Sequence, residues 1–159
     1  MKNFRTAMLC VCIALCSLCS SAQKQDQSIP FNKPNYNKPK LFINLPDSIS
    51  ISVDNLNSLF NTQLGRASSL NLSDNSTFRF EGQVMSTSSK YGNTIKSVVI
   101  RSTNYNGATL TISKTMNADG TISYSGRIIS FQSGDLFELQ NKDGHLTLVK
   151  RNFYDLVNE

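Results

Sequence analysis

Cysteine is absent from this chain after residue 19, and that absence excludes several kinds of chemistry. The four cysteines all lie near the start of the chain: Cys10, Cys12, Cys16 and Cys19. If residues 1–22 are removed, no disulfide, cysteine-ligated zinc site or thiol nucleophile can form. The remainder is long enough to bury a hydrophobic core without such cross-links, so we expect one folded domain.

Long hydrophobic runs are absent as well. The longest uncharged, largely apolar stretch, residues 6–18, is shorter than the ~20 apolar residues that a transmembrane helix needs. It follows Lys2 and Arg5 and precedes two serines and Ala22. This order predicts a cleavable signal peptide over residues 1–22, similar to bacterial envelope signals. The product would be secreted or periplasmic after cleavage near Ala22.

Lipidation is the alternative for this segment. Either Cys16 or Cys19 could be the acylated residue, which would bring the protein to a membrane. The residues before them are Leu15 and Leu18, where a lipobox has Gly or Ala. We therefore prefer cleavage without lipidation.

Clusters of one charge are absent too. The full chain carries a formal net charge of +5, and the loss of Lys2 and Arg5 with the signal peptide would leave +3. The remaining cations are scattered, without the basic clusters and interleaved aromatics of nucleic-acid-binding proteins. We expect no nucleic-acid partner.

Proline is confined to a short part of the chain, between Pro30 and Pro46. Residues 23–40 are rich in Pro, Lys and Asn, which predicts a flexible leader that acts as a tether. Residues 41–45 are apolar enough to offer an alternative, an arm that adds a strand to another protein's sheet. The single β domain is expected over residues 41–159.

Glycine is scarce but regularly placed. Five of the eight glycines follow or precede turn-forming residues between segments rich in β-formers: Gly92, Gly107, Gly120, Gly134 and Gly144. Such pairs are typical of antiparallel hairpins. They predict a six-stranded antiparallel meander, with strands near 77–88, 94–104, 108–116, 121–131, 135–141 and 145–151.

One short helix and one or two strands are expected before this meander. Alternation over 48–53 places Ile49, Ile51 and Val53 on one face of a strand. A helix should follow, capped by Asp54 and ended by Gly65, because apolar residues then recur at helical spacing: Leu56, Leu59, Phe60 and Leu64. A second short strand is expected near 69–72.

Two glycines fall inside predicted strands, Gly82 and Gly126, and predict bulges or bends. A bulge after Gly126 would turn Phe131 toward the core. Such bending favours a strongly curved sheet or a partly closed barrel, with the early strands and helix covering the opening. The polar second face and the absence of Trp argue against an outer-membrane barrel.

Residues that could carry catalysis are few. His145 is the only histidine; a triad would need Asp135 or Asp143 to orient it, and no nucleophile elbow is present. Glu81 and Glu138 could in principle form a glycosidase pair. We expect both on the surface instead, where Glu81 lies near an arginine of the same strand.

Two other patterns have simpler explanations. The segments 117–120 and 141–144 resemble fragments of calcium loops, but hairpin turns account for both. Four cations would form a basic stripe only if the strand registers aligned them: Arg101, Lys114, Arg127 and Lys150. No cofactor or metal site is predicted.

The leading hypothesis is an exported, non-enzymatic binding module that engages a protein in the envelope or outside the cell, for example as a protease inhibitor or propeptide-like factor. Its contacts are expected in the loops 86–94 and 103–107, through Tyr91 and Tyr105, since tyrosine is a favoured anchor on loops held by a rigid sheet.

A small-molecule carrier is the alternative. Its apolar interior would be lined by five aromatic residues: Phe78, Phe80, Tyr124, Phe131 and Phe137. A hydrolase ranks last, because no serine or carboxylate site can be located.

Overall fold

The computed structural model describes residues 35–71, 78–142 and 144–156. The predicted signal peptide, the candidate acylation sites Cys16 and Cys19, and the predicted leader up to residue 34 lie outside these residues. Among the helices that are described, none is both long and apolar enough to cross a membrane.

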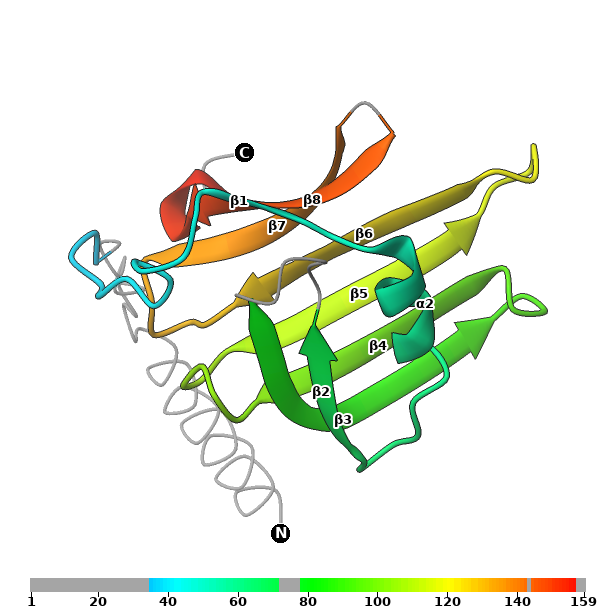
Figure 1. Cartoon of the computed structure of the whole chain (residues 1–159), viewed down its shortest axis with the longest axis horizontal. Helices are drawn as coiled ribbons and strands as arrows, with labels where there is room; N and C mark the ends of the chain where they lie inside the picture. The colour runs from blue at the N-terminus through cyan, green and yellow to red at the C-terminus, as the bar shows by residue number, and fades with distance from the viewer. Residues whose placement is uncertain (1–34, 72–77, 143, 157–159) are drawn as a thin grey trace, which may run out of the picture. The chain divides into compact units, whose positions relative to one another are not determined.

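The described chain forms one antiparallel sheet of eight strands, with the order β1-β8-β7-β6-β5-β4-β3-β2 (Figure 1). The strands are β1 (Ser48–Ser50), β2 (Ala67–Asn71), β3 (Arg79–Lys90), β4 (Ile95–Ser102), β5 (Thr109–Met116), β6 (Ile122–Ile129), β7 (Asp135–Lys142) and β8 (His145–Asn152). The predicted antiparallel meander is confirmed over β3 to β8. The count of six was too low, because the two early strands join the same sheet.

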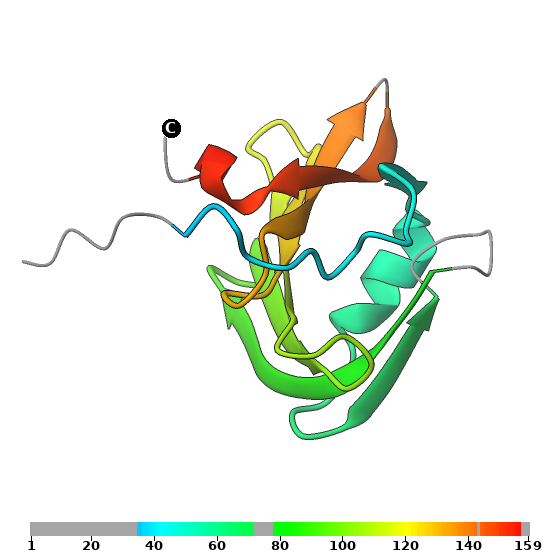
Figure 2. The same ribbon diagram turned by 90° about the vertical axis from the view of Figure 1, so that its left-hand side faces the viewer.

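The early segments connect the two edges of this sheet. β1 pairs with β8 at one edge and β2 pairs with β3 at the other. Helix α2 (Val53–Leu59) lies between them in the sequence and crosses the concave inner face of the sheet (Figures 1 and 2). The sheet is strongly curved but not closed, so of the two expected alternatives the curved sheet is found and the barrel is not (Figure 2). Within the described residues, the edge strands β1 and β2 each have one strand partner.

The hydrophobic core lies on the inner face of the sheet and includes residues of α2. Because successive side chains of a strand point to opposite faces, the buried residues of β3, β4 and β5 alternate along each strand. The fully buried side chains include Phe80, Val98, Ile100, Leu110, Ile128 and Phe137 from the sheet, and Leu56 and Leu59 from the helix. A short 3-10 helix, η2 (Phe153–Leu156), follows β8.

The start and end of α2 differ from the prediction. Val53 is the first helical residue and is partly exposed, so it does not share the buried face of Ile49 and Ile51. Ser52, not Asp54, stands at the N-cap, and the helix ends before Phe60. Gly65 does not cap it; its N–H instead donates to the carbonyl of Val84 in the loop that leads to β2.

The bulge lies elsewhere than predicted. The register between β3 and β4 shifts between Val84 and Ser86, whereas β5 and β6 pair without interruption. Glycine is required at position 126 because the backbone of β5 lies close to it. A Cβ there would lie 2.6 Å from the carbonyl oxygen of Thr111. With no bulge and with β6 ending at Ile129, Phe131 falls in the following turn and is 75% exposed.

Candidate functional site

The two tyrosines that the sequence suggested as contacts lie at opposite ends of the sheet. Tyr91 stands in the β3–β4 turn, where it is 79% exposed, and Tyr105 stands in the β4–β5 loop. The eight residues of β4 separate these two connections. The structure therefore does not bring Tyr91 and Tyr105 together, and the two ends must be considered separately.

The end that carries Tyr105 is packed with aromatic rings. The centroid of the Tyr105 ring lies 5.5 Å from that of Phe42, 5.9 Å from that of Phe78 and 6.1 Å from that of Phe80. The ring centroids of Phe137 and Phe42 lie 5.1 Å apart. Burial raises the pKa of Tyr105 above its ordinary value of 10.0. Tyr105 thus contributes its ring to the core.

The five aromatics expected to line a carrier cavity do not share one interior. Phe78, Phe80 and Phe137 are fully buried within this aromatic end. Phe131 is exposed, as described above. Tyr124 lies further along β6, where its hydroxyl donates to the side chain of Asn57 on α2 at 2.9 Å.

A buried carboxylate fixes the chain segment before β1 to the aromatic end. Asp135 accepts hydrogen bonds from the backbone N–H groups of Leu41 at 2.7 Å and Phe42 at 2.9 Å. The N–H of Gly134 donates to the carbonyl of Pro39 at 3.0 Å. Because Phe42 is fully buried, residues 41–45 contribute to this domain's own core.

The residues considered for catalysis do not converge. Asp135 and His145 lie at opposite ends of the β7–β8 hairpin, and His145 is exposed. Glu81 pairs with Arg79 at 2.9 Å, whereas Glu138 contacts Arg151 at 3.7 Å and accepts a hydrogen bond from Gln140. Both glutamates are in surface pairs, as expected. Asp143 lies outside the described residues.

Turn chemistry accounts for the described calcium-like fragment. Asp119 accepts hydrogen bonds from the hydroxyl and the N–H of Thr121, and these bonds lower the pKa of its carboxyl group. In the described ranges, no group of three or more His, Cys, Asp or Glu side chains is placed to hold a metal ion.

The four scattered cations do not form one stripe. Arg101 follows the buried Ile100, and Arg127 precedes the buried Ile128, so both point to the outer face. Lys114 and Lys150 point to the inner face by the same alternation. Lys150 is paired there, since its ammonium donates to the carbonyl of Leu45 and lies 3.3 Å from the carboxylate of Asp47.

The second half of β3 forms an open sheet edge. β2 pairs with β3 only as far as Gln83, and Val84 exchanges backbone hydrogen bonds with Gly65 and Arg66. Beyond the bulge at Met85, residues 86–90 pair with β4 on one side. On the other side, none of the described segments forms a strand with them. We call residues 85–90 the open edge.

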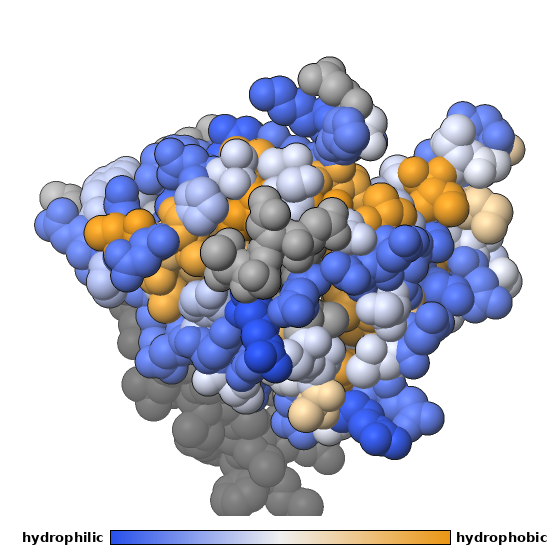
Figure 3. Space-filling view, in the orientation of Figure 1, coloured by the Kyte–Doolittle hydropathy of each residue, from blue (hydrophilic) through white to orange (hydrophobic). Residues whose placement is uncertain are grey.

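A polar cleft of about 240 Å³ borders the open edge. Its lining comes from β3, from the β3–β4 turn, from β4 and from the residue that follows α2: Thr87, Ser88, Ser89, Asn93, Lys96, Ser97 and Phe60. Three of these residues belong to the open edge itself. In Figure 3 the surface around this half of β3, at the lower right, is mainly hydrophilic. Edge and cleft therefore form one continuous surface.

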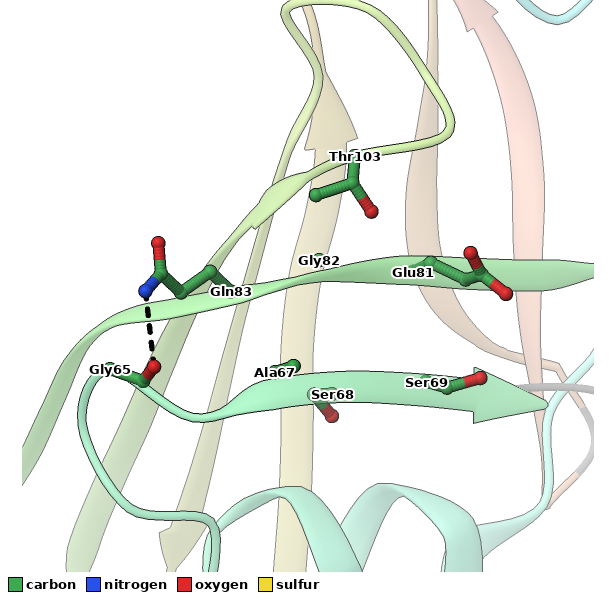
Figure 4. A pocket seen from close by; sticks show the side chains of 8 residues that line it. All are labelled: Gly65, Ala67, Ser68, Ser69, Glu81, Gly82, Gln83 and Thr103. Atoms are coloured by element: carbon green, nitrogen blue, oxygen red, sulfur yellow. Dashed lines mark hydrogen bonds between the residues drawn. The ribbon is translucent and has the colours of Figure 1, made fainter.

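A larger groove, of about 500 Å³, lies beside the first half of β3 (Figure 4). Three of its polar side chains, those of Gln83, Glu81 and Ser69, already have partners within the chain. The side chain of Gln83 donates to the carbonyl of Gly65 at 3.0 Å, and Arg79 contacts both Glu81 and Ser69. A ligand there would have to displace these interactions. The open edge is the better candidate because its backbone groups face no other strand among the described residues.

The fold defines the class of protein: an open, strongly curved antiparallel β sheet whose two edges are connected by a short helix. No protein-family model, curated protein or solved structure matches the chain. The open edge was not among the candidate sites predicted from the sequence. Its signal is nonetheless present, since the apolar alternation of Phe78, Phe80 and Val84 gives way to Ser86-Thr87-Ser88-Ser89.

Proposed function

We propose that this chain is an exported, non-enzymatic binding module that engages a protein in the envelope or outside the cell. It binds that protein by adding an extended segment of the partner to the open edge. The sequence pattern of residues 1–22 supports export. The partner would be a protease, if the chain acts as an inhibitor, or a secreted protein that needs a folding factor, if the chain acts like a propeptide.

The observation that carries the proposal is the unequal length of β2 and β3. β3 has twelve residues, whereas β2 pairs with only the first five of them. An unpaired strand edge offers a row of backbone N–H and C=O groups to another chain. Strand addition uses these groups for affinity and the alternating side chains for specificity.

The open edge has limits that suit one short partner strand. It begins at the bulge beside Met85 and ends at Lys90, two features that proteins use to prevent unrestricted edge pairing. Between them lie four residues with small hydroxyl side chains, which allow close approach of a neighbouring backbone. A strand of about five residues, the usual length in globular proteins, fits this span.

Site-specific cross-linking tests the proposal. A photo-reactive amino acid at Ser88 should capture one protein from the envelope or secreted fraction of the source organism. The matched control is the same amino acid at Arg127, which is exposed on the outer face of β6. Capture of the same protein with equal yield from both positions would contradict binding at the open edge.

Proline substitution in the open edge provides a second test of the proposal. Neighbouring N–H groups of a strand point to opposite sides, so one of Ser88 and Ser89 donates toward β4 and the other toward the open edge. Ser88→Pro and Ser89→Pro should therefore differ: one destabilises the sheet, and the other leaves stability nearly unchanged. The stable variant, without a cross-linker, should no longer bind the purified partner protein.

A further inference from the structure

We infer that the partner segment carries an acidic side chain, which enters the polar cleft and binds Lys96. This inference rests on the proposed function of the open edge and names what that edge selects. Its evidence is a row of inner-face residues at the end of the sheet that carries Tyr91.

The strand registers place four residues directly opposite one another across β3, β4, β5 and β6. Ser89 faces Lys96, Lys96 faces Lys114, and Lys114 faces Tyr124. Directly opposed residues of antiparallel strands have Cβ atoms about 4.5–5.5 Å apart. Two lysines thus emerge side by side on the concave inner face, next to the open edge.

The charge of these lysines is not balanced by an acid within the described chain. The ammonium of Lys114 donates to the side-chain oxygen of Asn57 at 2.9 Å, and the hydroxyl of Tyr124 donates to the same oxygen. Asn57 is neutral. The ion pairs formed among the described residues include neither Lys96 nor Lys114. Like charges placed directly opposite destabilise a sheet, so a bound anion would relieve a repulsion already present.

The lining of the cleft matches an anion. The described residues that line it include Lys96, the amide of Asn93 and several hydroxyl groups, and none of them is a carboxylate. Lys96 lines the cleft. Lys114, on the next strand, already donates a hydrogen bond to Asn57. Lys96 is therefore the cation that an anion in the cleft would meet. A carboxylate in this cleft would accept charge-assisted hydrogen bonds.

Strand addition delivers a side chain to this cleft. In β3 the residues Thr87 and Ser89 share the inner face with Val98 and Lys96 of β4. Alternate side chains of an added strand would point to the same face, beside Thr87 and Ser89. One of them would therefore enter the cleft, and a Glu or Asp at that position would meet Lys96.

Titration of the isotopically labelled chain with short peptides tests the inference. The probe is acetyl-Thr-Val-Thr-Glu-Thr-Val-amide, compared with the same peptide carrying Gln or Lys in place of Glu. We expect the Glu peptide to shift the backbone amide signals of the open edge and of Lys96. It should bind about two- to fivefold more tightly than the Gln peptide, the range expected for one ion pair at a partly exposed site. The Lys peptide should bind most weakly.

Two variants assign the preference. Lys96→Gln should bind the Glu and Gln peptides equally. Arg101→Gln, which removes a cation from the outer face of the same strand, should keep the preference of the unchanged chain. Equal affinity of the unchanged chain for the Glu and Gln peptides, with shifts at residues 85–90, would overturn the acidic preference and leave edge binding intact. A preference that persists in Lys96→Gln would also overturn it. If no peptide shifts residues 85–90, the proposed function fails and the inference fails with it.

Discussion

The two ends of the sheet are built from the same strands but have different side chains. At the end that carries Tyr105, the rings of Phe42, Phe78, Phe137 and Tyr105 contact one another within the core. At the end that carries Tyr91, the inner face of the same sheet carries two opposed lysines, and β3 has no partner strand beyond its bulge among the described segments.

This difference teaches how one small sheet can be both stable and open. Buried aromatic area stabilises the fold most where the rings pack, so the aromatic end supplies much of the stability. The end that carries Tyr91 contributes less to stability, so a strand edge and a cleft can stay accessible there. Four measurements test this difference between the two ends.

The largest effect is expected at Phe137, which is fully buried against Phe42 and Phe78. Phe137→Ala should lower the free energy of unfolding by about 3–5 kcal/mol, because it removes a buried ring and leaves a cavity. Chemical denaturation measures the loss. The matched control at the other end is Tyr91→Ala, expected to change stability by less than about 0.5 kcal/mol. Similar losses in the two variants would break the contrast between the ends.

The next effect concerns the carboxylate that holds the segment before β1. Asp135→Asn keeps one acceptor oxygen but replaces the other with a donor that faces a backbone N–H. We expect a loss of about 1–3 kcal/mol, typical of a buried hydrogen-bonding group left without its partner. Asp47→Asn, at a carboxylate that is almost fully exposed, is the control. An unchanged Asp135→Asn variant would show that the segment is held without the help of the carboxylate.

Alkaline pH should weaken the aromatic end selectively. The pKa of Tyr105 is raised by burial in the folded chain, so ionisation favours the unfolded chain. The stability that Tyr105 contributes is complete below its ordinary pKa of 10.0 and is lost as the pH rises through the higher value of the folded state. Denaturation between about pH 8 and about pH 11 should show a smaller decline in Tyr105→Phe than in the unchanged chain. Tyr91→Phe should decline like the unchanged chain.

The smallest effect is expected at the lysine pair. Lys96→Gln removes one of two opposed like charges and should raise the free energy of unfolding by about 0.2–1 kcal/mol at low salt. Because salt screens such repulsion, the gain should shrink at high ionic strength. Denaturation at two salt concentrations measures it. A loss of stability in Lys96→Gln would show that Lys96 has a structural partner.

Much of the fold could be predicted from the sequence because the relevant signals are local. The alternation of Val98 and Ile100 and the turn pair Asp119-Gly120 each specify their own hairpin. The outcome at Phe131 could not be predicted, since it depends on where β6 ends. Phe131 lies two residues beyond Ile129, the last residue of β6, and its ring is exposed because the strand ends before it.

The candidate site depends on non-local facts. The opposition of Lys96 and Lys114 follows from register, and a slip of one residue would have turned one of them to the outer face. The open edge follows from the length of β2 relative to β3, which no pattern within β3 specifies. Tyr105 is a further example. Its place in a loop predicts a surface contact residue, and only the rings packed around it show that it belongs to the core.

Amide hydrogen exchange of the purified chain, measured alone and with the protein that the cross-linker at Ser88 captures, tests binding at the open edge. Binding at the open edge predicts added protection at residues 85–90 and at Lys96, with little change at residues 103–107. Added protection confined to residues 103–107, at the aromatic end, would contradict the account.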